Sequence, residues 1–218
     1  MCEGLTYLEG CPDSVGGSFS CFKCPRLVSL KDAPKKVNGV FDCSNCKELT
    51  SLEGGPKYVG EDYSCSMCNK LVSLKGAPKI INKMFFCSYC PNLKTLMDGP
   101  VEVEKYDCSQ CNSLNNLRGC PKKIKHIFNC TGCINLNSLA GCPEEVFKFS
   151  CRNCDGLSTL EGGPQIVNYY DCSYCHGLTS LKGAPEKVKV IFDCRKCINA
   201  DLSIFKPEAR QFLSSEIK

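Results

Sequence analysis

One motif of 21 or 22 residues is repeated nine times in this chain, and this repetition limits the possible folds more than any other feature. Its general form is L-x-x-L-x-(G/D)-(small)-P-x-x-(V/I)-x(2–3)-(F/Y)-x-C-x-x-C-x-x, and the copies begin at Leu5, Leu27, Leu49, Leu71, Leu93, Leu114, Leu136, Leu157 and Leu178. A short fixed period is typical of a solenoid, in which each turn packs against its two neighbours, rather than of a domain with one central core.

Within each repeat an aromatic residue and the first cysteine are separated by one residue, as in Phe41-Asp42-Cys43. This alternation places the ring and the thiol on the same face of a strand. Nine such strands stacked in register predict one parallel β-sheet. The preceding segment carries Gly or Asp two residues before a proline, which favours turns and extended backbone over helix on the opposite side.

The repeats divide the chain into three parts. Residues 1–4 are an N-terminal lead, residues 5–199 are the nine repeats, and residues 200–218 are a C-terminal cap in which Pro207 to Glu216 predicts a short helix. The three 21-residue repeats all lose their residue just before the aromatic position, which predicts a loop there. Four residues are too few to cover the first repeat. We therefore expect an exposed N-terminal edge that is protected either by association, as in a homodimer, or by its own local shape.

The repeats resemble those of leucine-rich-repeat proteins, whose signature is L-x-x-L-x-L-x-x-(N/C)-x-x-L. Residues 103–114, VEKYDCSQCNSL, follow this spacing, with Tyr106 and Cys108 at strand leucine positions and Cys111 at the Asn/Cys position. The resemblance is to short, helix-poor repeats of bacterial and viral proteins. It implies a leucine-rich-repeat arc with its sheet on the concave face, a turn-rich convex side, and protein binding on the concave face.

Composition narrows the functional classes. Twenty-two of the 218 residues are cysteine, and the chain shows no secretory signal and no run of 18 apolar residues. These features predict a cytoplasmic protein with reduced thiols and no membrane contact. The net charge is only +4, and the lysines that follow the prolines have no stacking aromatics among them, so we expect no nucleic-acid binding.

Zinc binding is the main chemical alternative, because Cys21-x2-Cys24 and Cys43-x2-Cys46 have the spacing of a four-cysteine site. However, a zinc site needs four thiolates around one point, whereas a stack of repeats places its cysteines in rows. Inward thiols among apolar side chains also stay protonated. We therefore expect no metal and no other cofactor, and keep zinc storage or sensing as the alternative function.

Enzymatic chemistry has little support in the sequence. His126 and His176 are the two histidines, and neither has a nucleophile and an acidic residue arranged as a triad would need. No phosphate-binding loop or dinucleotide fingerprint occurs. We expect a non-enzymatic protein, which could also act as an adaptor for a separate enzyme.

The residues expected to point outward from the sheet indicate a binding face. In most repeats these positions hold small or polar residues, but Met67, Met84, Phe86 and Tyr89 come from adjacent repeats and predict an exposed apolar patch. Aspartates further along the same face would suit a partly basic partner. We expect a partner protein to bind at Met67, Met84, Phe86, Tyr89, Asp107, Tyr169, Asp171 and Tyr174.

Overall fold

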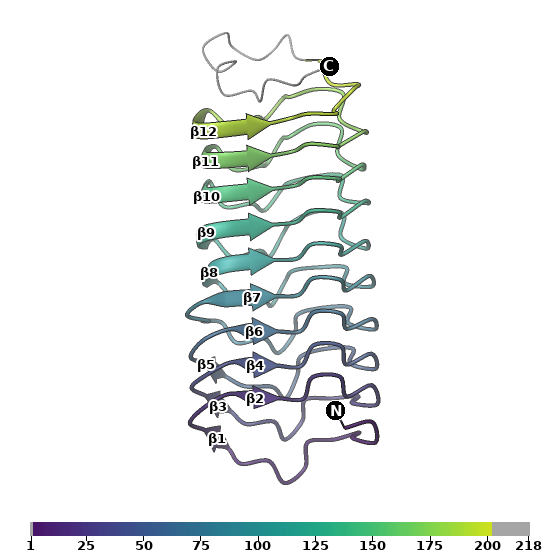
Figure 1. The fold of residues 1–218 in the computed structure, drawn as a ribbon, viewed down its shortest axis with the longest axis vertical. Coiled ribbons are helices and arrows are strands. Elements are labelled where there is room, and N and C mark those ends of the chain that lie inside the picture. Colours follow the sequence, from purple (N-terminus) through teal and green to yellow (C-terminus); the bar gives the residue numbers. More distant parts are fainter. Residues whose placement is uncertain (1, 202–218) are drawn as a thin grey trace.

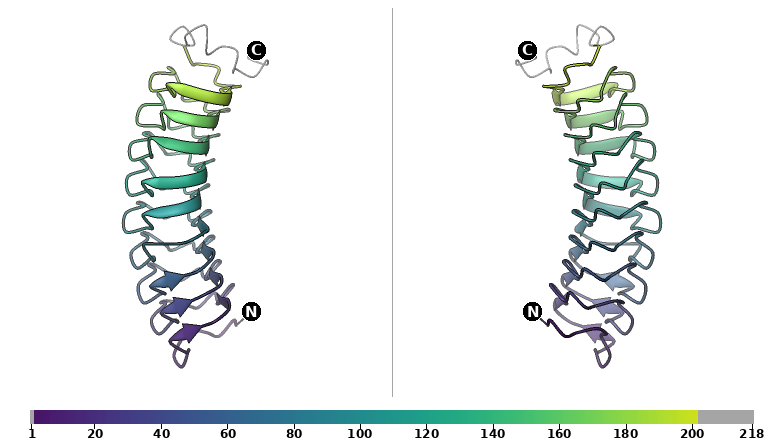
Figure 2. Two further views of the ribbon diagram at one scale, coloured as in Figure 1. Left: turned by 90° about the vertical axis from the view of Figure 1, so that its left-hand side faces the viewer. Right: turned by 90° about the vertical axis from the view of Figure 1, so that its right-hand side faces the viewer.

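A computed structural model describes residues 2–201 as a parallel β-solenoid in which each sequence repeat forms one turn (Figure 1). One strand from each repeat joins a nine-stranded sheet, and the described strands pair in parallel. Figure 2 shows that the stack of turns is a bowed column. The predictions of a solenoid and of a parallel sheet are therefore confirmed.

The described residues contain two sheets, whereas the sequence predicted one. The larger sheet contains β2 (Phe19–Ser20), β4 (Phe41–Asp42), β6 (Tyr63–Ser64), β7 (Met84–Phe86), β8 (Glu102–Asp107), β9 (Lys123–Asn129), β10 (Glu145–Ser150), β11 (Ile166–Asp171) and β12 (Lys187–Asp193). The smaller sheet contains β1 (Ser14–Val15), β3 (Lys36–Val37) and β5 (Tyr58–Val59). In later repeats the residues equivalent to the smaller sheet are the first part of one long strand.

Residue types just before the aromatic position explain this difference. Repeats one to three have Gly16-Gly17, Asn38-Gly39 and Gly60-Glu61 there, and the chain bends between two short strands. Glycine and asparagine favour such bends, whereas the chain is continuously extended where Glu104 or Phe147 occupies the interval. The predicted loop is thus wrong for repeats five to nine.

In those later repeats, a β-bulge accommodates the additional residue of a 22-residue turn. Between β8 and β9 the register shifts between the pairs Val103–Ile124 and Lys105–Ile127, and the same shift occurs between β11 and β12. A bulge inserts one residue without breaking the ladder on either side of it. Turns of 21 and 22 residues can therefore stack with the same core register.

The core consists of rows of equivalent side chains that extend through the stack. Each ring of the aromatic row lies 5.0 to 5.7 Å, centroid to centroid, from the next ring along the column from Phe19 to Phe192. Beside this column lie both cysteine rows and the two leucine rows, which are fully buried in the central repeats. Such ring spacing is in the favourable range for aromatic pairs.

The side opposite the large sheet is extended and rich in turns, as predicted. Its turns have a positive φ at the Gly/Asp position, including Asp32 at 66° and Gly76 at 97°. A Cβ atom on Gly76 would lie 2.3 Å from the backbone of Leu52 in the preceding turn. Glycine at this position therefore allows both the left-handed backbone and the close approach of two turns.

The leucine-rich-repeat assignment is not confirmed, since what the structure shows is the broader class of parallel β-solenoid. No helix occurs between residues 2 and 201. Most of the predicted cap, including its helix, lies beyond Asp201 and so outside the described residues. At the other end, Leu5 N donates to Cys2 O at 3.3 Å, as Leu27 N does to Cys24 O at 3.1 Å. The described part of the lead, residues 2–4, therefore forms the same turn as the end of a repeat.

Burial of the second leucine row leads to a stability prediction. Leu74 is 0% exposed, and replacing it with alanine leaves a cavity that its neighbours cannot fill completely. We expect Leu74→Ala to lower the free energy of unfolding by about 2–5 kcal/mol. The matched control is Val72→Ala, because Val72 lies in the same turn but is 43% exposed. Equal melting temperatures for both variants and the parent would contradict the assigned packing.

Candidate functional site

A tight C-x-x-C turn follows every strand of the large sheet and positions the surface residues beside it. The residue just before the second cysteine has a positive φ in all nine repeats, at Lys23, Asn45, Met67, Tyr89, Gln110, Gly132, Asn153, Tyr174 and Lys196. Only Gly132 is glycine. The other eight residues carry side chains, yet their backbone adopts the same left-handed conformation.

The second cysteine of each turn makes a hydrogen bond that sequence reasoning missed. In eight successive repeats its Sγ donates to the carbonyl oxygen of the first cysteine in the preceding repeat, at 3.0 to 3.4 Å. The bond from Cys46 to Cys21 is 3.2 Å, for example. A buried carbonyl without a partner is costly, so these thiols have a defined structural role besides packing. The regular 24- or 25-residue separation of these cysteines was the available signal.

The thiols are arranged in rows rather than around points. Within residues 2–201, no group of three or more His, Cys, Asp or Glu side chains converges as a metal site requires. Burial raises the pKa of Cys43 and Cys65 well above the usual range for a thiol. Neighbouring thiols raise both values further, since a second thiolate nearby would be repelled.

The four residues of the predicted apolar patch lie in two places: Met67 and Tyr89 line a recess, and Met84 and Phe86 lie on the neighbouring strand β7. Met67 and Tyr89 are 46% and 53% exposed and line one recess of about 420 Å³. Its complete lining is Asn45, Met67, Asn69, Tyr89, Pro91, Gln110 and Asn112, which we call the Met67–Tyr89 recess. Met84 and Phe86 are half-buried on β7 and do not line it.

Four carboxamides in the recess were not predicted as site residues. Their positions in the repeat could have identified them, because each lies at the left-handed residue of a C-x-x-C turn or two residues after it. One of them, Gln110, extends away from Tyr89 and lies over the next turn. A Cβ atom on Gly132 would be 2.1 Å from Gln110 Nε2, so the glycine provides the space that the amide occupies. Tyr89 and Gln110 both line the recess.

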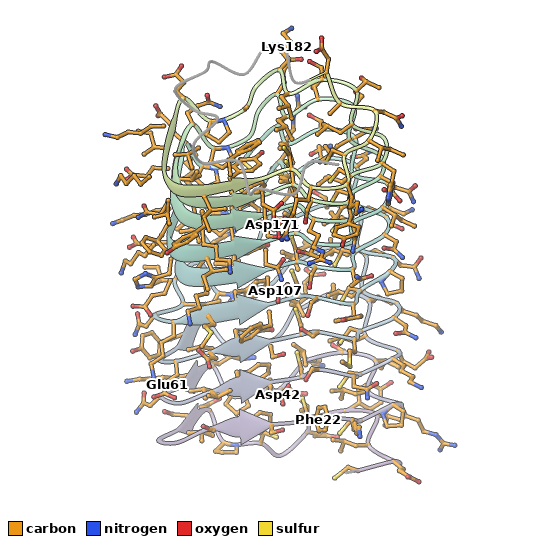
Figure 3. The ribbon with its side chains drawn as sticks, turned by 45° about the horizontal axis from the view of Figure 1, so that its top comes forward. Phe22, Asp42, Glu61, Asp107, Asp171 and Lys182 are labelled. Atoms are coloured by element: carbon orange, nitrogen blue, oxygen red, sulfur yellow. The ribbon has the colours of Figure 1, made fainter. Side chains whose placement is uncertain are left out.

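Asp107 and Asp171 have a structural role that the sequence analysis did not assign. Oδ1 of Asp107 accepts a hydrogen bond from Ser109 N at 2.9 Å, and Oδ1 of Asp171 accepts from Ser173 N at 2.9 Å and Ser173 Oγ at 2.6 Å. Asp42 caps its own turn in the same way, and Figure 3 shows the three aspartates in one line along the sheet. Their contact with a partner remains a prediction.

Phe86 occupies this capping position in the fourth repeat but has no side-chain oxygen. Its neighbour Ser88 is buried, and Ser88 Oγ instead forms a hydrogen bond with Ser66 Oγ at 3.0 Å. The fourth repeat thus lacks a turn cap that Asp42 or Asp107 provides elsewhere. The Phe86 side chain is half-exposed and cannot accept the hydrogen bond that caps the turn in those repeats.

Tyr169 and Tyr174 lie in repeat eight, away from the Met67–Tyr89 recess. The ring of Tyr169 is 5.7 Å from that of Phe147. The ring of Tyr174 lies 4.6 Å from the Arg152 guanidinium carbon. Beside Tyr174, the exposed His176 Nδ1 lies 3.0 Å from Asp155 Oδ1, within hydrogen-bond distance. The structure therefore separates the predicted site residues into two clusters.

Comparison with protein-family models, curated proteins and solved structures found no match to this chain. In the part of the chain that the structure describes, no helix is long and apolar enough to cross a membrane.

The buried thiols predict that stability depends on alkaline pH. Burial raises the pKa of Cys90 and Cys120 from 9.0 to about 12 in the folded protein. Unfolded thiols ionise near pH 9 while folded ones keep their protons, so this contribution is complete below pH 9 and declines as pH rises toward 12. We expect each such thiol to lower the free energy of unfolding by about 1.4 kcal/mol per pH unit in this interval.

Melting temperatures measured from pH 7 to 10.5 test this effect. Cys120→Ala is a suitable variant, because Ala33, Ala77 and Ala184 occupy the equivalent position in other repeats. It should make the alkaline decline shallower, whereas Cys2→Ser should not, because Cys2 is exposed. A melting temperature that is constant from pH 8 to 10.5 would contradict the predicted protonation of the buried thiols.

Proposed function

We propose that this protein is a non-enzymatic scaffold that binds another protein on the face of its large sheet, centred on the Met67–Tyr89 recess and β7. The observation that carries the proposal is the combination of exposure and backbone strain at Met67 and Tyr89. Their φ angles are 60° and 55°, yet both side chains are about half exposed. Large apolar side chains at such positions need a reason other than folding.

The strain argument compares equivalent positions. A left-handed conformation costs an ordinary residue roughly 1–2 kcal/mol, whereas glycine and asparagine tolerate it. Asn45, Gly132 and Asn153 occupy this position in three other repeats. Met67 and Tyr89 gain little burial in return. Retained strain at an exposed position is typical of functional surfaces.

Phe86 supports the same location. A serine, aspartate or asparagine occupies its position in the other eight repeats, and several of these side chains cap the following turn. Phe86 lacks that capping oxygen and lies on β7, between the strands that lead to the turns of Met67 and Gln110. Aromatic and methionine side chains together are enriched at the centres of protein interfaces.

The chemistry of the recess limits what a partner can insert. Four carboxamides, Met67, Tyr89 and Pro91 line it, and none of these groups is charged at neutral pH. Burying a charged side chain there would remove its hydration without providing an opposite charge. Carboxamides offer both donors and acceptors. The fitting anchor is therefore an uncharged side chain, apolar or amide-bearing, on a partner loop.

Tyr89→Asn tests the balance between stability and binding. We expect the free energy of unfolding to rise by about 0.5–1 kcal/mol, because asparagine tolerates the left-handed backbone better than tyrosine. We expect partner affinity to fall roughly thirtyfold, as for the loss of an interfacial aromatic anchor. Denaturant unfolding and a binding titration would be performed on the same preparations.

Lys196→Asn is the matched control, because Lys196 has the same positive φ outside the proposed site. It should be stabilised similarly and should retain every partner captured from the native host by the parent protein. A partner then purified from that capture should bind the control normally and Tyr89→Asn weakly. Equal binding by both variants would reject the recess as the binding site.

Phe86→Ser separates a structural role of the aromatic ring from a binding role. Serine restores the side-chain oxygen found in other repeats, so we expect stability to change by less than about 0.5 kcal/mol. Partner binding should weaken because the exposed ring is lost. Melting and binding are measured on one variant; reduced stability with intact binding would show that Phe86 serves the fold alone.

A further inference from the structure

The N-terminal end of the solenoid is an open sheet edge. Among the described strands, β2 pairs with β4 alone and β1 with β3 alone (Figure 1). Residues 2–4 form the end of a turn rather than a strand that could cover β2. The backbone N–H and C=O groups on the outer side of β1 and β2 therefore face no further strand among the described residues.

The direction of the hydrogen bonds identifies which groups these are. Phe19 N donates to Val40 O and Cys21 N donates to Asp42 O, both at 2.8 Å, so these amides point into the solenoid. Successive residues of a strand direct their N–H and C=O groups to opposite sides. The backbone groups of Ser18 and Ser20 consequently point outward from the edge.

The core is also open at this end. Leu5 and Phe19 are partly exposed, although their equivalents in the next turn, Leu27 and Phe41, are completely buried. Among the described residues the column of stacked rings thus ends at Phe19, which is only partly buried. Repeat proteins normally require a polar terminal cap at such a place.

We propose that a second copy of this chain covers the edge, with β2 of each copy pairing antiparallel across a two-fold axis at Phe19. In this register Ser18 of one copy lies opposite Ser20 of the other, and the reverse. Each pair can exchange both N–H···O bonds, as residues do in a hydrogen-bonded antiparallel pair. The result is one continuous sheet through both solenoids and contact between their two open core ends.

The edge favours a second copy in this orientation because it is complementary to itself. Ser18 and Ser20 are symmetric about Phe19, so one register satisfies both strands simultaneously. This isologous contact closes at two copies, whereas head-to-tail stacking would continue indefinitely.

Ser20→Pro tests the pairing directly. Proline removes the outward N–H of Ser20 and places its ring at the edge, but removes no backbone hydrogen bond within the solenoid. Sedimentation velocity over a range of concentrations should show a dimer for the parent. Two of the four central hydrogen bonds are lost in the variant, so its dissociation constant should rise roughly a hundredfold. Ser20→Ala keeps the N–H and should remain dimeric.

Amide hydrogen exchange provides a readout specific to this register. The Ser20 amide should exchange rapidly at low protein concentration and become protected as the dimer forms, while amides of β8 (Glu102–Asp107) stay protected throughout. A melting curve checks that Ser20→Pro is folded. A parent that is monomeric at all concentrations would overturn the proposal. So would a dimer unaffected by Ser20→Pro, or species that keep growing with concentration.

Discussion

Hydrogen bonding between neighbouring turns is the interaction on which the whole structure depends. No turn has a core of its own, so each relies on the turns before and after it. The strands supply the backbone bonds on one side, and the thiol-to-carbonyl bonds continue the connection where each strand ends and the chain turns. A thiol suits this position because it is small and apolar enough for the core but still donates a hydrogen bond.

This arrangement also determines where the surface can vary. Inward positions must keep the same size and chemistry because each touches its equivalents one turn away. Outward positions have no such constraint unless they cap a turn, as Asp107 and Asp171 do. Phe86 therefore stands out, because the other eight repeats have serine, aspartate or asparagine at its position. Met67 and Tyr89 add large, exposed apolar side chains at left-handed positions in the same region. The three residues come from repeats three and four, and this gives the binding proposal its location.

The same regularity creates a problem at the ends. Backbone groups that join each pair of turns are exposed at the first turn, where the described chain offers no further strand. Two core residues, Leu5 and Phe19, are only partly buried there. A binding face along the side and a pairing edge at one end occupy different surfaces. The two proposed contacts could therefore form at once without competing for the same residues.

The sequence alone determined the solenoid, the parallel sheet and the inward rows, because these follow from a fixed period and from the alternation in Phe41-Asp42-Cys43. Only the tertiary structure decided the second sheet, the capping role of the aspartates and the carboxamide lining of the recess. The recess lining depends on which side chains meet across adjacent turns, about 22 residues apart in sequence. The aspartate caps and the bends between the two sheets depend instead on the local backbone geometry of each turn. A pattern within one repeat shows which way a residue points, but the stack decides what it touches.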